Sequence, residues 1–250
     1  MAALFDVSGK TVCVTGASSG LGRQAASLLA SAGAKVVGVA RRAEELNAWS
    51  DSAHGDTACV IADLAARDTL GDVAGAVADP FGPVDILINA AGINTRQHAD
   101  EVTDAGWDVT MNLNLAAPFF LAQAMVPAMK EKGWGRIINF ASLQSRRAFP
   151  SGISYGASKG GVEQMTRAMA EAWSGSGITA NAVAPGFFRT ELTGPVFADP
   201  VLAQKNADQT CIGRNGEPVD LDGPLMFFCS PASDYVTGQT LFVDGGFTAK

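Results

Sequence analysis

Tyr155 and Lys159 lie four positions apart in the stretch SYGASKGG, residues 154–161. If the segment is helical, both side chains share one helix face, with their β-carbons about 5–6 Å apart. A free phenol titrates near pH ~10, and a positive charge ~4 Å away favours the phenolate by about 4 kcal/mol at an effective dielectric of ~20. The pair is therefore a candidate acid/base with a pKa of about 7–8, although this spacing is also common on helix surfaces without any function.

A glycine-rich turn, TGASSGLG at residues 15–22, joins an apolar run to a helical pattern. Glycine allows positive φ and close approach of a phosphate, and a helix N-terminus offers free N–H groups with roughly half a positive charge. The spacing is GxxxGxG rather than the usual GxGxxG, and a tight strand-to-helix connection alone would also favour glycine. Because the turn lies in the first unit of a βαβ pattern, we predict dinucleotide binding by Gly16, Ser18, Ser19, Gly20, Leu21 and Gly22.

The second strand-like run ends at Arg41 and Arg42, where an NAD-binding protein usually carries an acidic residue for the ribose hydroxyls. Arginine suits a 2′-phosphate instead, so we favour NADP(H), with NAD(H) possible. The alternative is that both arginines simply solvate the start of a helix. Asp63 and Leu64 follow the third run; Asp63 is placed to accept from the adenine amino group, or to cap a helix.

The elements that must position these residues alternate along the chain. Apolar, strand-like runs are separated by segments of helical periodicity, notably 20–33, 105–131 and 154–175. This alternation predicts an α/β fold, a Rossmann-type doubly wound parallel sheet in one domain covering 1–250, with ligands at the carboxyl ends of the strands. The predicted strands are 11–16, 34–40, 58–63, 84–92, 135–142, 177–186 and 239–246.

Residues 187–216 depart from this alternation, because they are rich in turn formers and follow a strand end directly. Long loops in compact domains are usually functional or disordered. We interpret this stretch, called here the lid segment, as a mobile substrate lid.

Composition excludes several functional classes. The net charge of −7 and the absence of long basic runs argue against nucleic-acid or anionic-membrane surfaces. The four cysteines are scattered and there are two histidines, so we expect no metal site. The N-terminus does not resemble a signal peptide, and we expect no apolar stretch that approaches the ~20 residues of a membrane span. We expect a soluble, cytoplasmic protein.

Taken together, these motifs resemble the short-chain dehydrogenase/reductase family along nearly the whole chain. The turn TGASSGLG matches its cofactor loop, and Asn89-Ala90-Ala91-Gly92 its "NAG" turn, although Ile88 stands where an asparagine is usual. The resemblance implies a catalytic set of Asn114, Ser142, Tyr155 and Lys159, with Asn114 preferred over Asn112 on spacing. It also implies cofactor contacts from Asn89, Ala90, Gly92, Tyr155, Lys159, Pro185, Gly186, Phe188 and Thr190.

The resemblance gives each catalytic residue a role. Tyr155 exchanges a proton with the substrate oxygen, and Lys159 lowers its pKa and bonds the ribose. Ser142 donates to the substrate oxygen, or merely bonds the backbone at a strand end. Asn114 holds a water in a proton relay, or is a buried asparagine that bends its helix; both roles are compatible.

Arginines near the expected site suggest an acidic substrate. Guanidinium groups pair bidentately with carboxylates. We predict substrate contacts from Arg96, Ser142, Gln144, Arg146, Arg147, Tyr155 and Arg189, with surface ion pairs as the alternative role of the arginines.

Within the family, WDVTMNLN and SDYVTGQTLFVDGG resemble the sugar-acid branch, which acts on 2-deoxy-gluconate, gluconate and uronate-derived keto acids. The predicted function is thus an NADP(H)-dependent oxidoreductase of a small polar, sugar-derived acid. The alternatives are a 3-oxoacyl-thioester (acyl-carrier-protein) reductase and, in another class, a non-catalytic nucleotide-sensing regulator. The resemblance also implies a homotetramer.

Overall fold

The computed structural model describes residues 2–250 and contains one parallel sheet in that range. Its seven strands follow the order β3-β2-β1-β4-β5-β6-β7, and every neighbouring pair is parallel. Each predicted strand is present, with ends that differ by a few residues. The strands are β1 (Thr11–Thr15), β2 (Lys35–Ala40), β3 (Thr57–Ile61), β4 (Ile86–Asn89), β5 (Gly135–Phe140), β6 (Ile178–Pro185) and β7 (Thr240–Val243).

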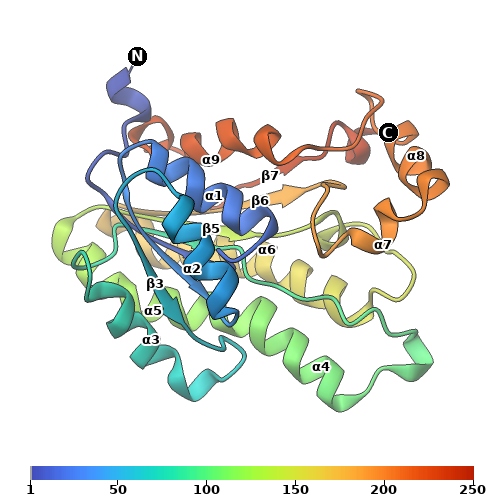
Figure 1. Cartoon of the computed structure of the whole chain (residues 1–250), viewed down its shortest axis with the longest axis horizontal. Helices are drawn as coiled ribbons and strands as arrows, with labels where there is room; N and C mark the ends of the chain where they lie inside the picture. Colours follow the sequence, from blue (N-terminus) through green and yellow to red (C-terminus); the bar gives the residue numbers. More distant parts are fainter. Residues whose placement is uncertain (1) are drawn as a thin grey trace.

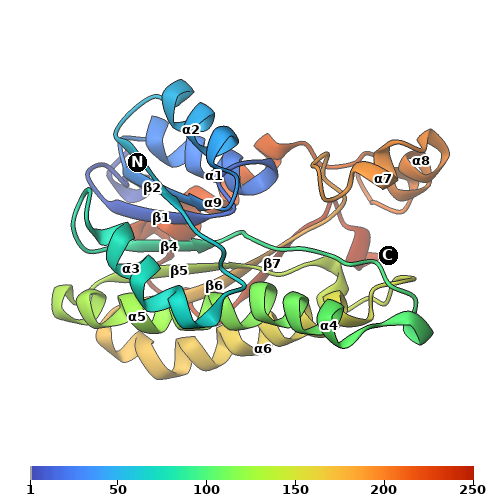
Figure 2. The ribbon, with the colours of Figure 1, turned by 60° about the horizontal axis from the view of Figure 1, so that its bottom comes forward.

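Helices cover both faces of the sheet, which explains why its central strands are apolar on both sides. In Figure 2, α1, α2 and α9 lie on one face of the sheet, and α3, α4, α5 and α6 lie on the other. The predicted doubly wound α/β fold is confirmed. The helices are α1 (Gly20–Ser31), α2 (Ala43–Ser52), α3 (Leu70–Ala78), α4 (Asp104–Met111), α5 (Ala117–Lys132), α6 (Ile153–Trp173), α7 (Gly194–Phe197), α8 (Pro200–Asp208) and α9 (Asp222–Cys229).

The strand order reverses direction at β1 and β4, which are neighbours in space. Their register pairs Thr15 with Asn89, so the two strands end side by side. Crossovers from β1 and β4 leave toward opposite faces, and the opening between them is the usual ligand site of such sheets. This topology brings the glycine-rich turn after β1 next to the segment after β4.

The region predicted as one helix, 105–131, is interrupted. A π-helical turn at Asn112–Ala116 separates α4 from α5. By length and composition alone, the stretch Asp104–Lys132 is apolar enough to cross a membrane. The expectation that no apolar stretch approaches the length of a membrane span is therefore wrong. Half of the most apolar window of this stretch is buried inside the protein, since α5 packs on β5 and α3, so core packing accounts for its apolar residues.

The lid segment contains two short helices, α7 and α8, which the sequence pattern did not predict. Figure 1 shows both helices beyond the ends of β6 and β7, and Figure 2 shows them standing apart from the three layers. A bridge between Phe188 and Gly216 joins the two ends of the segment. The lid segment is therefore anchored at its base, and its mobility stays a prediction.

Candidate active site

A cavity of about 800 Å³ opens at the carboxyl ends of the strands. The glycine-rich turn forms one part of its wall, and Ser142, Tyr155 and Lys159 form another. The lid segment contributes Val196 from α7 and Leu202 from α8. The structure thus brings the predicted cofactor loop and three of the predicted catalytic residues to one continuous cavity.

The glycine-rich turn has the geometry that a bound diphosphate requires. Gly16 and Gly20 adopt φ values of +74° and +56°, in the left-handed region that favours glycine. A β-carbon on Gly22 would lie 2.4 Å from the carbonyl oxygen of Gly16, so only glycine lets α1 start this close to β1. No side chain caps the N-terminus of α1, which leaves its first N–H groups available. These residues fit a dinucleotide cofactor.

Arg41 and Arg42 both line the cavity but differ in their contacts. Arg42 Nη2 donates to the Ser18 hydroxyl at 3.3 Å and to the Glu191 carboxylate at 2.9 Å. Arg41 lies 3.8 Å from the Asp63 carboxylate across the ends of β2 and β3. Arg42 is therefore the arginine that reaches the glycine-rich turn.

Tyr155 lies on the first turn of α6, where its phenol is buried beside Ser142. Burial raises the pKa of Tyr155, while hydrogen bonding to Ser142 and the charge of Arg96 lower it less strongly. Without a bound cofactor, loss of water around the phenolate outweighs the nearby charges, and the lowering of this pKa by Lys159 together with an oxidised nicotinamide stays a prediction. The phenol is therefore protonated at neutral pH in this structure.

Lys159 lies one turn further along α6 and is also buried. Its Nζ donates to the carbonyl oxygen of Phe140 at 2.6 Å and lies 5.7 Å from the centre of the Tyr155 ring. Burial lowers the pKa of Lys159 to about 8, so the ammonium loses part of its charge in mildly alkaline solution.

Ser142 follows β5 and caps the 3₁₀ turn Leu143–Ser145. Its hydroxyl oxygen accepts from the Gln144 N–H at 3.1 Å, so the backbone role considered for this serine is present. The Ser145 hydroxyl donates to the Lys159 carbonyl oxygen at 2.8 Å. This second contact fixes the turn against α6, and both Ser142 and Gln144 line the cavity.

Asn114 lies in the π-helical turn, is 1% exposed and does not line the cavity. Its Oδ1 accepts from the Ile93 N–H and its Nδ2 donates to the Ile93 carbonyl oxygen, both at 2.9 Å. Nδ2 also donates to the Ser158 hydroxyl at 3.1 Å. The amide is thus engaged by protein groups, which supports the buried structural role; the water relay stays a prediction.

Asn89, a predicted cofactor contact, lies beside the cavity lining rather than in it, and its contact with a cofactor stays a prediction. Its side chain points into the sheet interior, where Nδ2 donates to Asn139 Oδ1 at 2.9 Å, and it does not line the cavity. The next residues, Ala90 and Gly92, do line it. The reason is that Asn89 is the last residue of β4, still within the sheet. The remaining predicted cofactor residues, Asp63, Leu64, Pro185, Gly186, Phe188 and Thr190, all line the cavity.

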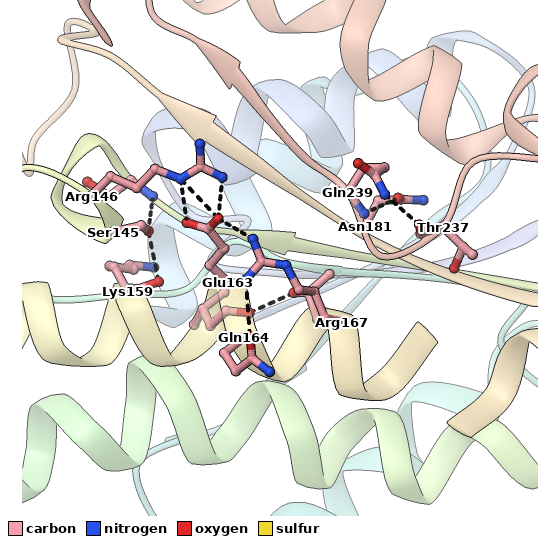
Figure 3. A network of polar contacts seen from close by, with 12 residues as sticks. Ser145, Arg146, Lys159, Glu163, Gln164, Arg167, Asn181, Thr237 and Gln239 are labelled. Atoms are coloured by element: carbon pink, nitrogen blue, oxygen red, sulfur yellow. Dashed lines mark hydrogen bonds and ion pairs between the residues drawn. The ribbon is translucent and has the colours of Figure 1, made fainter. Parts of the chain in front are cut away.

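Three of the four predicted substrate arginines do not line the cavity. Figure 3 shows Arg146 turned toward Glu163, to which its Nε donates at 3.0 Å, while Arg167 donates to the same carboxylate at 2.8 Å. Arg147 lies over the Phe247 ring and Arg189 over the Phe197 ring. Arg146 is thus paired with a buried carboxylate, and contact of Arg146, Arg147 and Arg189 with a substrate stays a prediction.

Arg96 is the predicted substrate arginine that lines the cavity. It has a φ of +53°, an uncommon value for a residue with a β-carbon, and its Nη2 donates to the Leu192 carbonyl oxygen of the lid segment at 2.7 Å. Its charge also lowers the pKa of Tyr155. Arg96 is therefore held between the lid segment and the candidate acid/base.

Several cavity residues were missed by sequence reasoning. Glu191 gives no signal in the sequence, because a glutamate in a polar loop is normally solvated. Phe149 and Phe187 are in edge contact, with ring centres 5.8 Å apart, and form an aromatic part of the wall. Asn94 and Asn206 also line the cavity. Only the approach of distant segments identifies these residues.

Among residues 2–250, no three or more His, Cys, Asp or Glu side chains are grouped so that they could hold a metal ion. The cysteines do not form disulfides. Cys13 and Cys229 are buried, and burial raises the pKa of both thiols to about 12. These two thiols are therefore unreactive packing residues.

Comparisons with known proteins agree with this geometry. Residues 16–248 match a family described as "Enoyl-(Acyl carrier protein) reductase". The chain is 39% identical to gluconate 5-dehydrogenase of Gluconobacter oxydans, covering 99% of this chain and 98% of the relative. It is also 39% identical to 2-dehydro-3-deoxy-D-gluconate 5-dehydrogenase of Escherichia coli, covering 98% of both chains.

Solved structures have the same fold. A crystal structure of a gluconate 5-dehydrogenase from Burkholderia cenocepacia, in complex with NADP and tartrate, superposes with a TM-score of 0.91. It is 36% identical to this chain and covers 99% of it, and the match spans 98% of that structure. The similarity therefore extends over the whole sheet and the cavity.

Proposed function

The chain belongs to the short-chain dehydrogenase/reductase family and is an NAD(P)-dependent oxidoreductase; on that premise we propose that it uses NADP(H) to interconvert a ketone and a secondary alcohol. We further propose a small, sugar-derived acid as the substrate. The single observation that carries the proposal is the cavity shared by the glycine-rich turn, Arg42 and the Ser142–Tyr155–Lys159 set. The homotetramer and the cytoplasmic location stay predictions.

The residues of the chain divide the chemistry among them. A bound nicotinamide supplies or accepts the hydride. Tyr155, protonated at neutral pH, is suited to donate a proton to the carbonyl oxygen during reduction. Ser142, whose hydroxyl lowers the pKa of the Tyr155 phenol, supplies a second polar group for the same oxygen. Oxidation of an alcohol needs the phenolate instead, so this direction is favoured by higher pH.

The substrate assignment has two sources of support. Arg96 offers a guanidinium inside the cavity of an otherwise acidic protein, and guanidinium recognises carboxylate bidentately. Relatives of similar length are described as acting on gluconate and 2-dehydro-3-deoxy-D-gluconate. Gln144 and Asn94 add neutral polar groups that suit the hydroxyls of such a molecule.

The test is a steady-state screen of NADPH and NADH oxidation with keto acids derived from gluconate, their neutral keto-sugar analogues, and a 3-oxoacyl thioester. We expect turnover of a keto acid with NADPH. Arg96→Ala should raise KM for the keto acid at least tenfold and leave KM for the neutral analogue within about twofold, as lost carboxylate pairing predicts. Equal effects on both substrates would refute carboxylate recognition, and turnover of the thioester alone would favour the acyl alternative.

A further inference from the structure

The Glu191 carboxylate, near the start of the lid segment, takes up the donors expected to recognise the 2′-phosphate of the cofactor. Arg42 donates to both carboxylate oxygens, from Nη1 at 3.3 Å and from Nη2 at 2.9 Å. The same Nη2 lies 3.3 Å from the hydroxyl oxygen of Ser18 in the glycine-rich turn. All three residues line the cavity. A lid carboxylate and a cofactor phosphate would thus meet at one guanidinium.

We propose that Glu191 is a specificity-determining residue whose carboxylate competes with the 2′-phosphate of NADP(H) for Arg42. The inference deepens the proposed function and rests on its cofactor assignment. Its consequence is that the wild-type protein prefers NADP(H) over NAD(H) less than its two arginines alone would dictate.

The competition follows from charge and donor geometry. A phosphate monoester carries a charge of about −1.5 to −2 near neutral pH and seeks the same guanidinium fork as a carboxylate. Arg42 cannot offer one fork to both groups. Two anions that share a small site also repel each other. NADP(H) must therefore displace Glu191 from Arg42, whereas NAD(H) has no 2′-phosphate and leaves the ion pair intact.

The state of Glu191 supports this competition. The hydrogen bond from Arg42 is the main cause that lowers the pKa of Glu191, and the Ser19 hydroxyl lowers it further, so the carboxylate is charged at neutral pH. Its side chain is 64% exposed. Release from Arg42 therefore returns the carboxylate to water without burying a charge, and the lid segment loses its contact with the end of β2.

The experiment compares Glu191→Gln with a matched control, Glu45→Gln. Glu45 lies on α2, 3.7 Å from Nη1 of Arg42, and does not line the cavity, so the control removes the same charge near the same arginine. The readout is the Kd for NADPH and for NADH, measured by the fluorescence of the reduced cofactor in the absence of substrate. A second pair of probes, adenosine 2′,5′-bisphosphate and 5′-AMP, isolates the contribution of the 2′-phosphate.

We expect Glu191→Gln to lower the Kd for NADPH about tenfold, which corresponds to about 1.4 kcal/mol of binding free energy. The Kd for NADH should change by less than about twofold. Glu45→Gln should change the Kd for either cofactor by less than about twofold. In an Arg42→Gln background, Glu191→Gln should no longer distinguish the two cofactors, because the shared partner is gone.

Two results would overturn the proposal. One is an equal change of NADPH and NADH affinity in Glu191→Gln; the other is a selective gain in Glu45→Gln as large as in Glu191→Gln, which would reflect net charge alone. A wild-type protein that binds neither NADPH nor NADH would instead refute the cofactor assignment of the proposed function. The side chain of Glu191 is 64% exposed and that of Glu45 is 47% exposed, so both variants should fold like the wild type.

Discussion

Replacing Asn114 with leucine, a residue of nearly equal size without polar atoms, should test what this buried amide does. The change removes the two hydrogen bonds at 2.9 Å with the Ile93 backbone and the one at 3.1 Å with Ser158. Each net bond contributes about 1 kcal/mol, and a buried group left without its partner costs about 1–3 kcal/mol. Since the Ile93 N–H and carbonyl both lose their partner, we expect a loss of about 3–5 kcal/mol.

Thermal unfolding measures this loss directly. For a chain of this size 1 kcal/mol corresponds to about 2–4 °C, so Tm should fall by roughly 6–20 °C at fixed protein concentration. Asn112→Leu is the matched control. It lies in the same π-helical turn, and none of the side-chain hydrogen bonds found within residues 2–250 involves it. Its Tm should stay within about 3 °C of the wild type, because substitutions that break no specific contact usually change stability little.

The outcome distinguishes the two roles considered for Asn114. If Asn114→Leu had the Tm of the wild type but a much lower kcat, the amide would act on the reaction. The structural reasoning would then be refuted. Asn114→Asp adds a check, because a carboxylate can accept from the Ile93 N–H but cannot donate to the Ile93 carbonyl. It also buries a charge at a position that is 1% exposed, so it should destabilise at least as much as leucine.

Three further predictions concern the catalytic set and the glycine-rich turn. Tyr155→Phe should lower kcat at least a hundredfold and leave the NADPH Kd within about twofold, as loss of a proton donor predicts; parallel losses in stopped-flow and binding assays would contradict this role. Lys159 has a pKa of about 8 when folded against 10.5 ordinarily, so the unfolded state binds more protons in that window and stability rises with pH through it. From pH 7.5 to 9.5 the free energy of unfolding in urea should rise by about 2 kcal/mol relative to Lys159→Met, and identical pH profiles would disprove the buried ammonium. Gly22→Ala should weaken NADPH binding at least tenfold, because its β-carbon would lie 2.4 Å from the Gly16 carbonyl oxygen, whereas Gly75→Ala, with open space around it, should bind like the wild type in the same titration.

The pairing of Tyr155 and Lys159 was predictable from local geometry, because a helix places positions four apart on one face. Ser142 was expected only from the family resemblance, and the catalytic roles of these three residues stay predictions. The protonation state was not predictable in this way. Burial, which depends on everything packed around α6, raises the pKa of Tyr155 and lowers that of Lys159.

The arginines show the limit of sequence reasoning more directly. Arg96 and Arg146 were equal candidates in the sequence, yet one reaches the cavity and the other is held by Glu163. Nothing local decides between them, because a long flexible side chain goes to the strongest partner within reach. That partner is known only when α6 is packed against the turn after β5.

The sequence by itself determined the alternation of strands and helices, the glycine-rich turn and the order of the candidate catalytic residues. These features are short-range, since the periodicity of apolar residues and the absence of a β-carbon act within a few positions of the chain. Only the tertiary structure decided which polar groups meet in the cavity. Arg42 and Glu191 are 149 positions apart, so their contact exists only because the sheet brings distant loops to one edge.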